Sequence, residues 1–319
     1  YFNHKIKIQN KIIYKGRCFV VAEISANHSG SLSKLKRLIL RLKKINVDAI
    51  KIQAYEANTI TINSDSPDFK IPKGNAWEKF KNLYQLYQKA ETPFHWYKEI
   101  FDFCKANKVI VFASVFDVSS LNLLEKIGCP AYKIASFEAV DLPLIKYVAS
   151  TGKPMIISTG IADADEIKEA VEAAQEGGCN QLALLHCVSG YPAPAADYNL
   201  RTIPDMIERF GIITGLSDHT LDNSTAVASV ALGACIIEKH FTLDRNRGGP
   251  DDSFSLEPNE LFSLCRDAKT AWTAIGRTYY GPKSSERNNL KFRRSLYFVK
   301  SMKAGDNIMP DSVRSVRPG

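Results

Sequence analysis

Eight short apolar runs recur along the chain with helix-like segments between them, and this alternation restricts the fold more than any other feature. Most runs are continuously apolar, as expected of parallel strands that are buried on both faces. The intervening segments, such as SLSKLKRLILRLKKI (31–45), have the apolar spacing of amphipathic helices. The eight runs are FVVAEIS (19–25), AIKIQA (49–54), VIVFASV (109–115), AYKIAS (131–136), PMIIST (154–159), QLALLHC (181–187), IITGLSD (212–218) and ACIIEKHFT (234–242).

Strand and helix alternating eight times predicts an α/β protein built as a (β/α)8 TIM barrel. An open doubly wound sheet is the alternative, although no GxGxxG turn follows the first strand. The second connection is the longest and carries an insertion near residues 58–90. We divide the chain into an N-terminal extension (1–16), a TIM-barrel domain (17–282), and a linker followed by a strand, a turn and a short helix-like piece (283–319).

Composition and charge exclude several classes of protein. The apolar runs are far shorter than the ~20 residues of a membrane-spanning helix, and the basic start does not resemble a signal peptide. Seven cysteines without a CxxC pair indicate reduced core residues rather than a disulfide or metal framework. The net charge of +8 comes with no nucleic-acid-binding motif and suits a small anionic substrate. We therefore expect a cytoplasmic protein with neither nucleic acid nor membrane as its partner.

Polar residues gather where the predicted strands end, which is the end of such barrels that carries the chemistry. An unpaired buried charge is costly. The large number of polar residues at these positions therefore predicts a binding or active site rather than a structural core. The positions are Glu23, Lys51, Gln53, Ser114, Lys133, Ser136, Glu138, Ser158, Ser189, Tyr191, Ser217, His219, Glu238, His240 and Asp251.

Two kinds of ligand fit these residue types. Lys51 and Lys133 with nearby hydroxyls would bind a phosphate and a carboxylate, since lysine supplies compact positive charge and hydroxyls supply short donors. His219 in GLSDHT and His240 in IIEKHFT close consecutive strands, a spacing that permits a divalent metal with its other positions left to water and substrate. The alternative is that both histidines hydrogen-bond to the neighbouring carboxylates of Asp218 and Glu238.

Long motifs in order along nearly the whole chain resemble the sialic acid synthase family. They are AEISANHSG, AIKIQAY, AYKIASFE, ISTGIA, LLHCVSGYPAP, GLSDHT, IIEKHFTLD and GGPDDSFSLEP. Within the family, NSDSPDFKI and KIASFE are most similar to pseudaminic acid synthases. The tail SLYFVKSMKAGDNI, ending in SVRPG, resembles the start of the family's small antifreeze-like (SAF) C-terminal domain.

The resemblance implies an enzyme that condenses phosphoenolpyruvate with an N-acetylated amino sugar and water, giving a nine-carbon 2-keto acid and phosphate. In this branch the sugar would be 2,4-diacetamido-2,4,6-trideoxy-altrose. N-acetylneuraminic and legionaminic acid synthases, which use other amino sugars, are the alternative. The resemblance also implies a divalent cation, Mn²⁺ or Mg²⁺, and a homodimer in which the small domain reaches the barrel of the partner.

Site roles follow from the matching motifs. His219 and His240 would hold the metal, and Glu23 and Glu138 are the candidates for moving protons and activating water. Arg317 matches a family arginine that reaches the sugar from the partner subunit. Phosphoenolpyruvate would lie among Lys51, Ser114, Lys133, Ser136, Ser158, Ser189 and Ser217, and the sugar among Glu23, Gln53, Glu138, Tyr191 and Asp251.

Two other classes of function remain open from the residues themselves. A Schiff-base aldolase would use Lys51 or Lys133 as its nucleophile, and borohydride trapping with pyruvate would reveal it. A non-catalytic barrel that binds sugars or anions would take up phosphoenolpyruvate without releasing phosphate.

Overall fold

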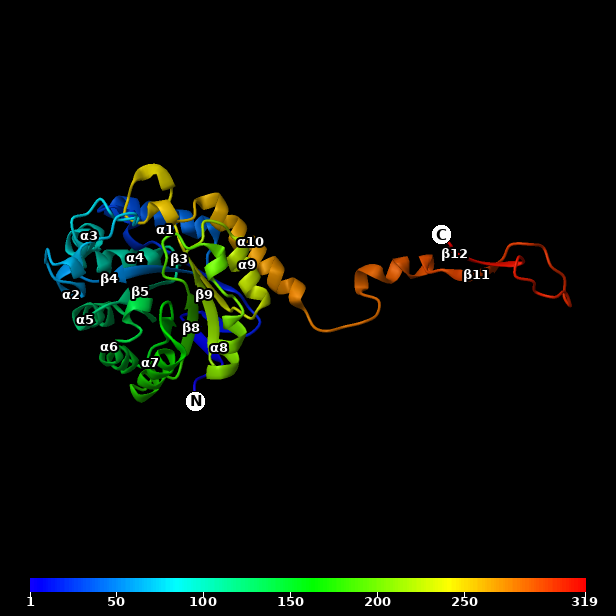
Figure 1. Ribbon diagram of the computed structural model, residues 1–319, viewed down its shortest axis with the longest axis horizontal. Coiled ribbons are helices and arrows are strands. Elements are labelled where there is room, and N and C mark those ends of the chain that lie inside the picture. The colour runs from blue at the N-terminus through cyan, green and yellow to red at the C-terminus, as the bar shows by residue number, and fades with distance from the viewer. The chain divides into compact units, whose positions relative to one another are not determined.

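The computed structural model describes residues 1–319 and contains a closed barrel of eight parallel strands. The strands follow the chain around the barrel, and β10 pairs with β3 to close it (Figure 1). Each predicted strand is present, with ends that differ by at most a few residues, so the TIM-barrel prediction is confirmed. The strands are β3 (Phe19–Glu23), β4 (Ala49–Ala54), β5 (Val111–Val115), β6 (Tyr132–Ile134), β7 (Met155–Ser158), β8 (Leu182–Cys187), β9 (Ile213–Asp218) and β10 (Ile236–His240).

Helices surround the barrel strands (Figure 1). The longest connection contains two additional helices. The outer helices are α1 (Leu32–Ile45), α4 (Tyr97–Ala106), α5 (Val118–Ile127), α6 (Leu142–Ala149), α7 (Ala164–Glu176), α8 (Thr202–Phe210), α9 (Ser224–Ala231) and α10 (Pro258–Ile275), and the insertion adds α2 (Ala57–Ile60) and α3 (Leu83–Ala90).

Helix α1 shows how local sequence sets these elements. The Ser31 side chain accepts a hydrogen bond from the Lys34 backbone N–H at 3.2 Å, which caps the start of the helix. Asn46 ends the helix in the left-handed conformation, with φ of 65°. Leu35, Leu38, Ile39 and Leu42 recur every three or four residues and are fully buried, so this face packs toward the barrel.

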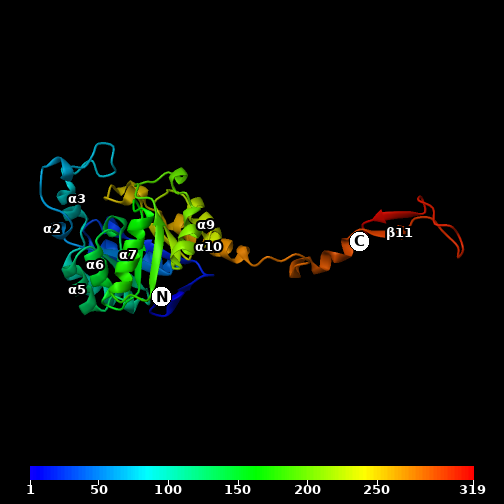
Figure 2. The same cartoon turned by 60° about the horizontal axis from the view of Figure 1, so that its bottom comes forward.

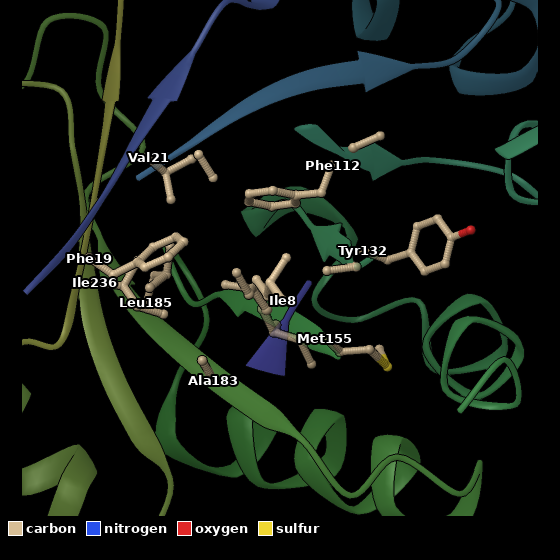
Figure 3. Packing of buried hydrophobic residues seen from close by; sticks show 14 of the residues in the cluster. Ile8, Phe19, Val21, Phe112, Tyr132, Met155, Ala183, Leu185 and Ile236 are labelled. Atoms are coloured by element: carbon tan, nitrogen blue, oxygen red, sulfur yellow. The ribbon is translucent and has the colours of Figure 1, made fainter. Parts of the chain in front are cut away.

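The strand register sorts the barrel interior into an apolar end and a polar end. Parallel neighbours in register face the same side, and side chains alternate between the two faces along each strand. On β3 the inward positions are Phe19, Val21 and Glu23, which pair with Ile236, Glu238 and His240 on β10. Apolar side chains fill the part of the interior nearer the amino ends of the strands. They include Phe19, Val21, Phe112 and Ile236 (Figure 3). The inward charged groups Lys51 and Glu238 follow these apolar positions along their strands, toward the carboxyl end of the barrel.

Gly215 on β9 allows the barrel to close tightly. A Cβ atom at this position would lie 2.4 Å from the Ile236 carbonyl oxygen and 2.8 Å from Cδ2 of Leu185. A larger residue would therefore force β9 away from β10.

An N-terminal hairpin, which the sequence analysis treated only as an extension, closes the other end of the barrel. Strands β1 (Lys5–Ile8) and β2 (Lys11–Tyr14) pair in antiparallel fashion. Ile6, Ile8 and Ile13 are fully buried, and Ile8 belongs to the same packed cluster as Met155 and Leu185 (Figure 3). Lys11 forms an ion pair of 2.9 Å with Asp48, just before β4 begins. Figure 2 shows the hairpin and the α2–α3 insertion at opposite ends of the barrel.

The chain divides into two compact units, Tyr1–Ile275 and Gly276–Gly319. In the second unit, β11 (Ser295–Phe298) pairs antiparallel with β12 (Val313–Val316), which fits the small antifreeze-like domain expected there. None of the helices combines the length and hydropathy that crossing a membrane requires.

Candidate active site

Four buried charges form a continuous network inside the polar end of the barrel. Lys51 Nζ lies 2.6 Å from Glu23 Oε2 and 2.9 Å from Glu238 Oε1. Lys133 Nζ lies 2.7 Å from the same Glu238 oxygen. Lys51 also donates to Ser114 Oγ at 3.0 Å. The strands β3, β4, β6 and β10 thus each contribute one charge, and the two positive and two negative charges balance.

Burial and ion pairing shift the pKa values of the groups in this network in opposite directions. Burial by itself raises the pKa of Glu238, but the two lysines outweigh it and hold that pKa below its usual value. The pKa of Lys51 is raised despite burial, because two carboxylates surround its ammonium group. Burial raises the pKa of Glu23, with Lys51 opposing the shift. Lys51 is therefore an ammonium ion and a poor nucleophile.

Hydroxyl groups line the same mouth, and several have no partner. Ser136 Oγ accepts from the Gly160 N–H at 3.1 Å, whereas Ser158 Oγ and Ser189 Oγ are buried without any hydrogen bond. A Cβ atom on Gly160 would lie 2.3 Å from Ser189 Oγ and 2.8 Å from Ser136 Oγ. The glycine therefore keeps a space open between the two hydroxyls. Such unpaired buried donors are rare in folded proteins and indicate a ligand-binding position.

His219 and His240 lie side by side, with ring centroids 5.5 Å apart. His219 Nδ1 is 2.8 Å from the Val188 carbonyl oxygen, which leaves its Nε2 available, and His240 Nδ1 is buried without a partner. Burial, followed by the charge of His219, holds the pKa of His240 well below its usual value, so the ring is neutral. Two oriented imidazoles fit a divalent cation. No third His, Cys, Asp or Glu completes a metal-binding group, so substrate or water would supply the other ligands.

The alternative explanation, in which both histidines hydrogen-bond to the carboxylates of Asp218 and Glu238, does not match the contacts in the structure. The Asp218 carboxylate accepts from the Thr220 N–H at 2.8 Å and pairs with Lys239 at 2.9 Å, on the outward side of β9 and β10. Glu238 is occupied by the two lysines described above. Neither carboxylate is hydrogen-bonded to His219 or His240.

A cavity of about 500 Å³ adjoins His240. Gln53, Glu138, Tyr191, His240 and Asp251 line it, together with aromatic and aliphatic side chains. Tyr191 stacks on His219, with centroids 4.3 Å apart. Burial raises the pKa of Glu138 to about 7, and its Oε2 atom has no partner. The volume is in the range of small-molecule sites.

The structure brings together almost all of the residues that the sequence analysis selected. Glu23, the two lysines and the serines gather inside the strand ends, and the remaining barrel residues line the cavity or contact its histidines. Arg317 follows β12 in the second unit, and its role stays a prediction.

Glu238 was among the strand-end residues selected from the sequence, although no ligand role was assigned to it; it lies two residues before His240 on one strand and therefore faces the same side. Two other contributors, Ser25 and Trp77, were absent from the selected set. Ser25 hydrogen-bonds to Asp251, and Trp77 donates to Asp251 Oδ1 at 3.2 Å. No local pattern indicates that Trp77, in the insertion, meets Asp251.

Comparisons with known proteins agree with this geometry. The model of the NeuB family matches residues 38–280. The pseudaminic acid synthase of Campylobacter jejuni is 40% identical over 302 residues, which is 95% of this chain and 88% of that protein. The pseudaminic acid synthase of Helicobacter pylori is 38% identical over 301 residues, 94% of this chain and 88% of that protein. A crystal structure of N-acetylneuraminic acid synthetase from Leptospira borgpetersenii superposes with a TM-score of 0.80 at 30% identity, covering 92% of this chain and 97% of that one.

Proposed function

Since the chain belongs to the NeuB family of sialic acid synthases, we propose that it condenses phosphoenolpyruvate with 2,4-diacetamido-2,4,6-trideoxy-altrose and water. Membership makes it a phosphoenolpyruvate-dependent sugar acid synthase, a transferase that forms a C–C bond. The choice of sugar is supported by the identity of 38% and 40% to two pseudaminic acid synthases. The products would be the nine-carbon 2-keto acid and inorganic phosphate.

The observation that carries the proposal is the set of unpaired buried polar atoms at one end of the barrel. Ser158 Oγ, Ser189 Oγ, Glu238 Oε2, His240 Nδ1 and Glu138 Oε2 all lack hydrogen-bond partners. Leaving such atoms unpaired costs about 1–3 kcal/mol each. A polar ligand that pairs with them removes that cost, so these atoms are suited to binding substrate rather than to stabilising the fold.

Lys133 and Lys51 would hold the anionic groups of phosphoenolpyruvate. Both ammonium groups lie within 3 Å of Glu238 Oε1. The serines at the neighbouring strand ends would donate to the remaining phosphate and carboxylate oxygens. Such donors, positioned before the reaction, stabilise the phosphate as it leaves.

The bond changes balance as follows. C3 of phosphoenolpyruvate attacks the aldehyde carbon of the open-chain sugar, whose carbonyl oxygen takes up a proton and becomes a hydroxyl, and positive charge is left at C2. Water adds at C2 and loses a proton, which replaces the one taken up by the aldehyde oxygen. The tetrahedral intermediate then expels phosphate through C–O cleavage, and the proton of its C2 hydroxyl leaves with the phosphate as the ketone forms. Glu23, which lies beside Lys51, would stabilise the cation. Glu138, with a pKa of about 7, is suited to exchanging a proton near neutral pH.

His219 and His240 are the residues that would hold the divalent cation. When bound, such a cation polarises the aldehyde carbonyl. Tyr191 stacks on His219, and Phe254 packs against His240 with centroids 5.1 Å apart, so both rings keep their orientation.

The test is phosphate release from phosphoenolpyruvate with Mn²⁺, comparing the diacetamido-trideoxy sugar with N-acetylmannosamine. Release with the first sugar alone is the expected result. Release with the second alone would assign the chain to the neuraminic branch. Borohydride trapping of pyruvate on Lys51 or Lys133 would instead support a Schiff-base aldolase and would contradict this mechanism.

Two variants assign the binding roles. For Lys133→Met we expect the KM for phosphoenolpyruvate to rise at least tenfold, since a charged hydrogen bond contributes about 1.5–3 kcal/mol. For His240→Ala we expect metal-dependent turnover to be lost while the melting temperature is retained. An unchanged KM in the first case, or normal rates at limiting Mn²⁺ in the second, would refute the corresponding role.

A further inference from the structure

The cavity beside the histidines has a polar floor and an apolar cover. The floor is formed by the barrel mouth, from which Gln53, Glu138, His240 and Asp251 project. The cover is the segment 57–90, inserted between β4 and α4, and it supplies Ile60, Ile71, Pro72, Asn75, Trp77, Leu83, Leu86, Tyr87 and Ala90. Figure 2 shows α2, α3 and the loop between them standing at this end of the barrel.

The apolar cover follows from the pattern of α3. Leu83, Leu86, Tyr87 and Ala90 recur at positions i, i+3, i+4 and i+7, so all four lie on one face of the helix and all four line the cavity. The Asn82 side chain caps this helix by accepting from the Gln85 N–H at 2.9 Å. The exposed positions of α3 include the polar residues Gln85, Gln88 and Lys89, so its apolar face is directed toward the cavity and the neighbouring segments.

The cover is held in its middle, where it contacts the loop after β10, and at its base, where its two ends are joined to each other. Trp77 Nε1 donates to the Pro250 carbonyl at 2.8 Å, and the Ala57 N–H donates to Glu91 Oε2 at 2.8 Å. Tyr55, at the end of β4, packs edge-on against Tyr87 and Phe116 with centroids 5.6 and 5.3 Å away. These contacts make the apolar wall a fixed part of the cavity.

The chemistry of the reaction orients the sugar between floor and cover. Its aldehyde carbon must lie on the floor, where phosphoenolpyruvate and the histidines meet. The far end of the open chain, with C5 and C6, then points toward the cover. A hydroxyl on C6 would lose its water shell against Leu83, Leu86 and Ile71, which offer no hydrogen-bond partner. Asn75, Tyr55 and Tyr87 also line the cavity and bring a few polar groups, a number suited to acetamido groups.

We propose that the segment 57–90 is the specificity element of the site, selecting a sugar whose end remote from the aldehyde is a methyl group rather than a hydroxymethyl group. This inference rests on the proposed function, because only the condensation places the aldehyde on the floor. It assigns the discrimination to Leu83, Leu86 and Ile71, none of which touches the reacting atoms.

The experiment compares one sugar with its 6-hydroxy counterpart of the same stereochemistry, using the full chain with phosphoenolpyruvate and Mn²⁺. We expect kcat/KM to favour the 6-deoxy sugar by about 10- to 100-fold, the range that an apolar pocket achieves against an added hydroxyl. Leu83→Asn should reduce this ratio about tenfold, and Leu83→Met should preserve it. Ile71→Thr, outside any helix, should also reduce the ratio.

The matched control is Leu40→Asn, the same replacement at a position that is 39% exposed on α1 and remote from the cavity. It should change neither the ratio nor the KM for phosphoenolpyruvate. If Leu83→Asn and Ile71→Thr keep the wild-type melting temperature and the wild-type ratio, the inference is wrong. Phosphate release that shows no preference in the wild type would also overturn it while leaving the condensation intact. No release from any N-acetylated amino sugar would overturn the proposed function itself.

Discussion

Glu238 is the residue on which the charge network depends, because its Oε1 atom is within 3 Å of both Lys51 and Lys133. Glu238→Gln leaves two buried ammonium groups with Glu23 as their remaining counter-charge. We expect the free energy of unfolding to fall by about 3–5 kcal/mol, as when one partner of a buried ion pair is removed. Because inorganic phosphate can replace the lost negative charge, it should raise the melting temperature of the variant more than that of the wild type.

A matched control for this prediction is Glu99→Gln, since Glu99 pairs with Lys36 at the surface and its side chain is 54% exposed. Exposed pairs contribute about 0–1 kcal/mol, so the control should melt close to the wild type. Equal losses in the two variants, or an absent phosphate effect, would show that the network does not provide the anion site.

Glu138 is expected to lower stability at neutral pH. Its pKa is raised by burial from 4.5 to about 7, so the folded state holds this proton more tightly than the unfolded state. The free energy of unfolding therefore falls as pH rises from about 4.5 to about 7. Glu138→Gln stays neutral and should be more stable than the wild type by about 2–3 kcal/mol at pH 8, with little difference at pH 4.

Urea unfolding at the two pH values measures this effect, and Glu169→Gln on the exposed face of α7 is the control. The dependence of kcat/KM on pH gives a second measurement. If Glu138→Gln removes the change in kcat/KM near pH 7, Glu138 also moves a proton in the reaction. A stability gain that does not depend on pH would contradict the burial of an ionisable carboxyl group.

At the scale of elements, the N-terminal hairpin acts as a plug for the apolar end of the barrel. Ile8 is fully buried in the barrel cluster, whereas Ile12 in the same hairpin is 41% exposed. We expect Ile8→Ala to lower the free energy of unfolding by about 2–4 kcal/mol, the usual cost of a large-to-small change in a packed core. Ile12→Ala should cost less than about 1 kcal/mol.

Denaturant unfolding of both variants tests this prediction, and phosphate release gives an independent check. Because the hairpin lies at the opposite end of the barrel from the insertion that lines the cavity, the KM values should stay the same in both variants. Similar losses for Ile8→Ala and Ile12→Ala would mean that the hairpin is not part of the core.

At the scale of the molecule, the two units are expected to fold independently. A chain that ends at Ile275 contains the whole barrel, the hairpin and the insertion. We expect it to keep the melting transition of the full chain to within a few degrees and to bind phosphoenolpyruvate equally well. Calorimetry and a binding titration measure this, and a loss of more than about 2 kcal/mol would show that the second unit is needed for the barrel to fold.

Two further predictions concern the sugar-binding role of Arg317, in the second unit, and the homodimer. If the arginine binds the sugar, Arg317→Ala should raise the KM for the sugar about 10- to 100-fold without changing the melting temperature. Sedimentation of the full chain tests the oligomeric state directly. An unchanged KM for the sugar would remove Arg317 from the site.

Local sequence patterns were enough to predict the eight strands, the closed-barrel class and nearly every polar residue at the strand ends. These properties are local, because continuous apolar runs identify buried parallel strands and alternation along each strand decides which side chains face inward. Both histidines were recognised in this way, since each closes a strand-like run.

Only the tertiary structure decided which of those residues meet. Glu238 reaches Lys51 and Lys133 because β10 closes onto β3, a contact between segments far apart in the sequence. The pairing of His219 with the Val188 carbonyl and the position of the 57–90 cover above the cavity are likewise products of closure. Local patterns carry no information about these distances, because strand pairing, not residue preference, brings the groups together.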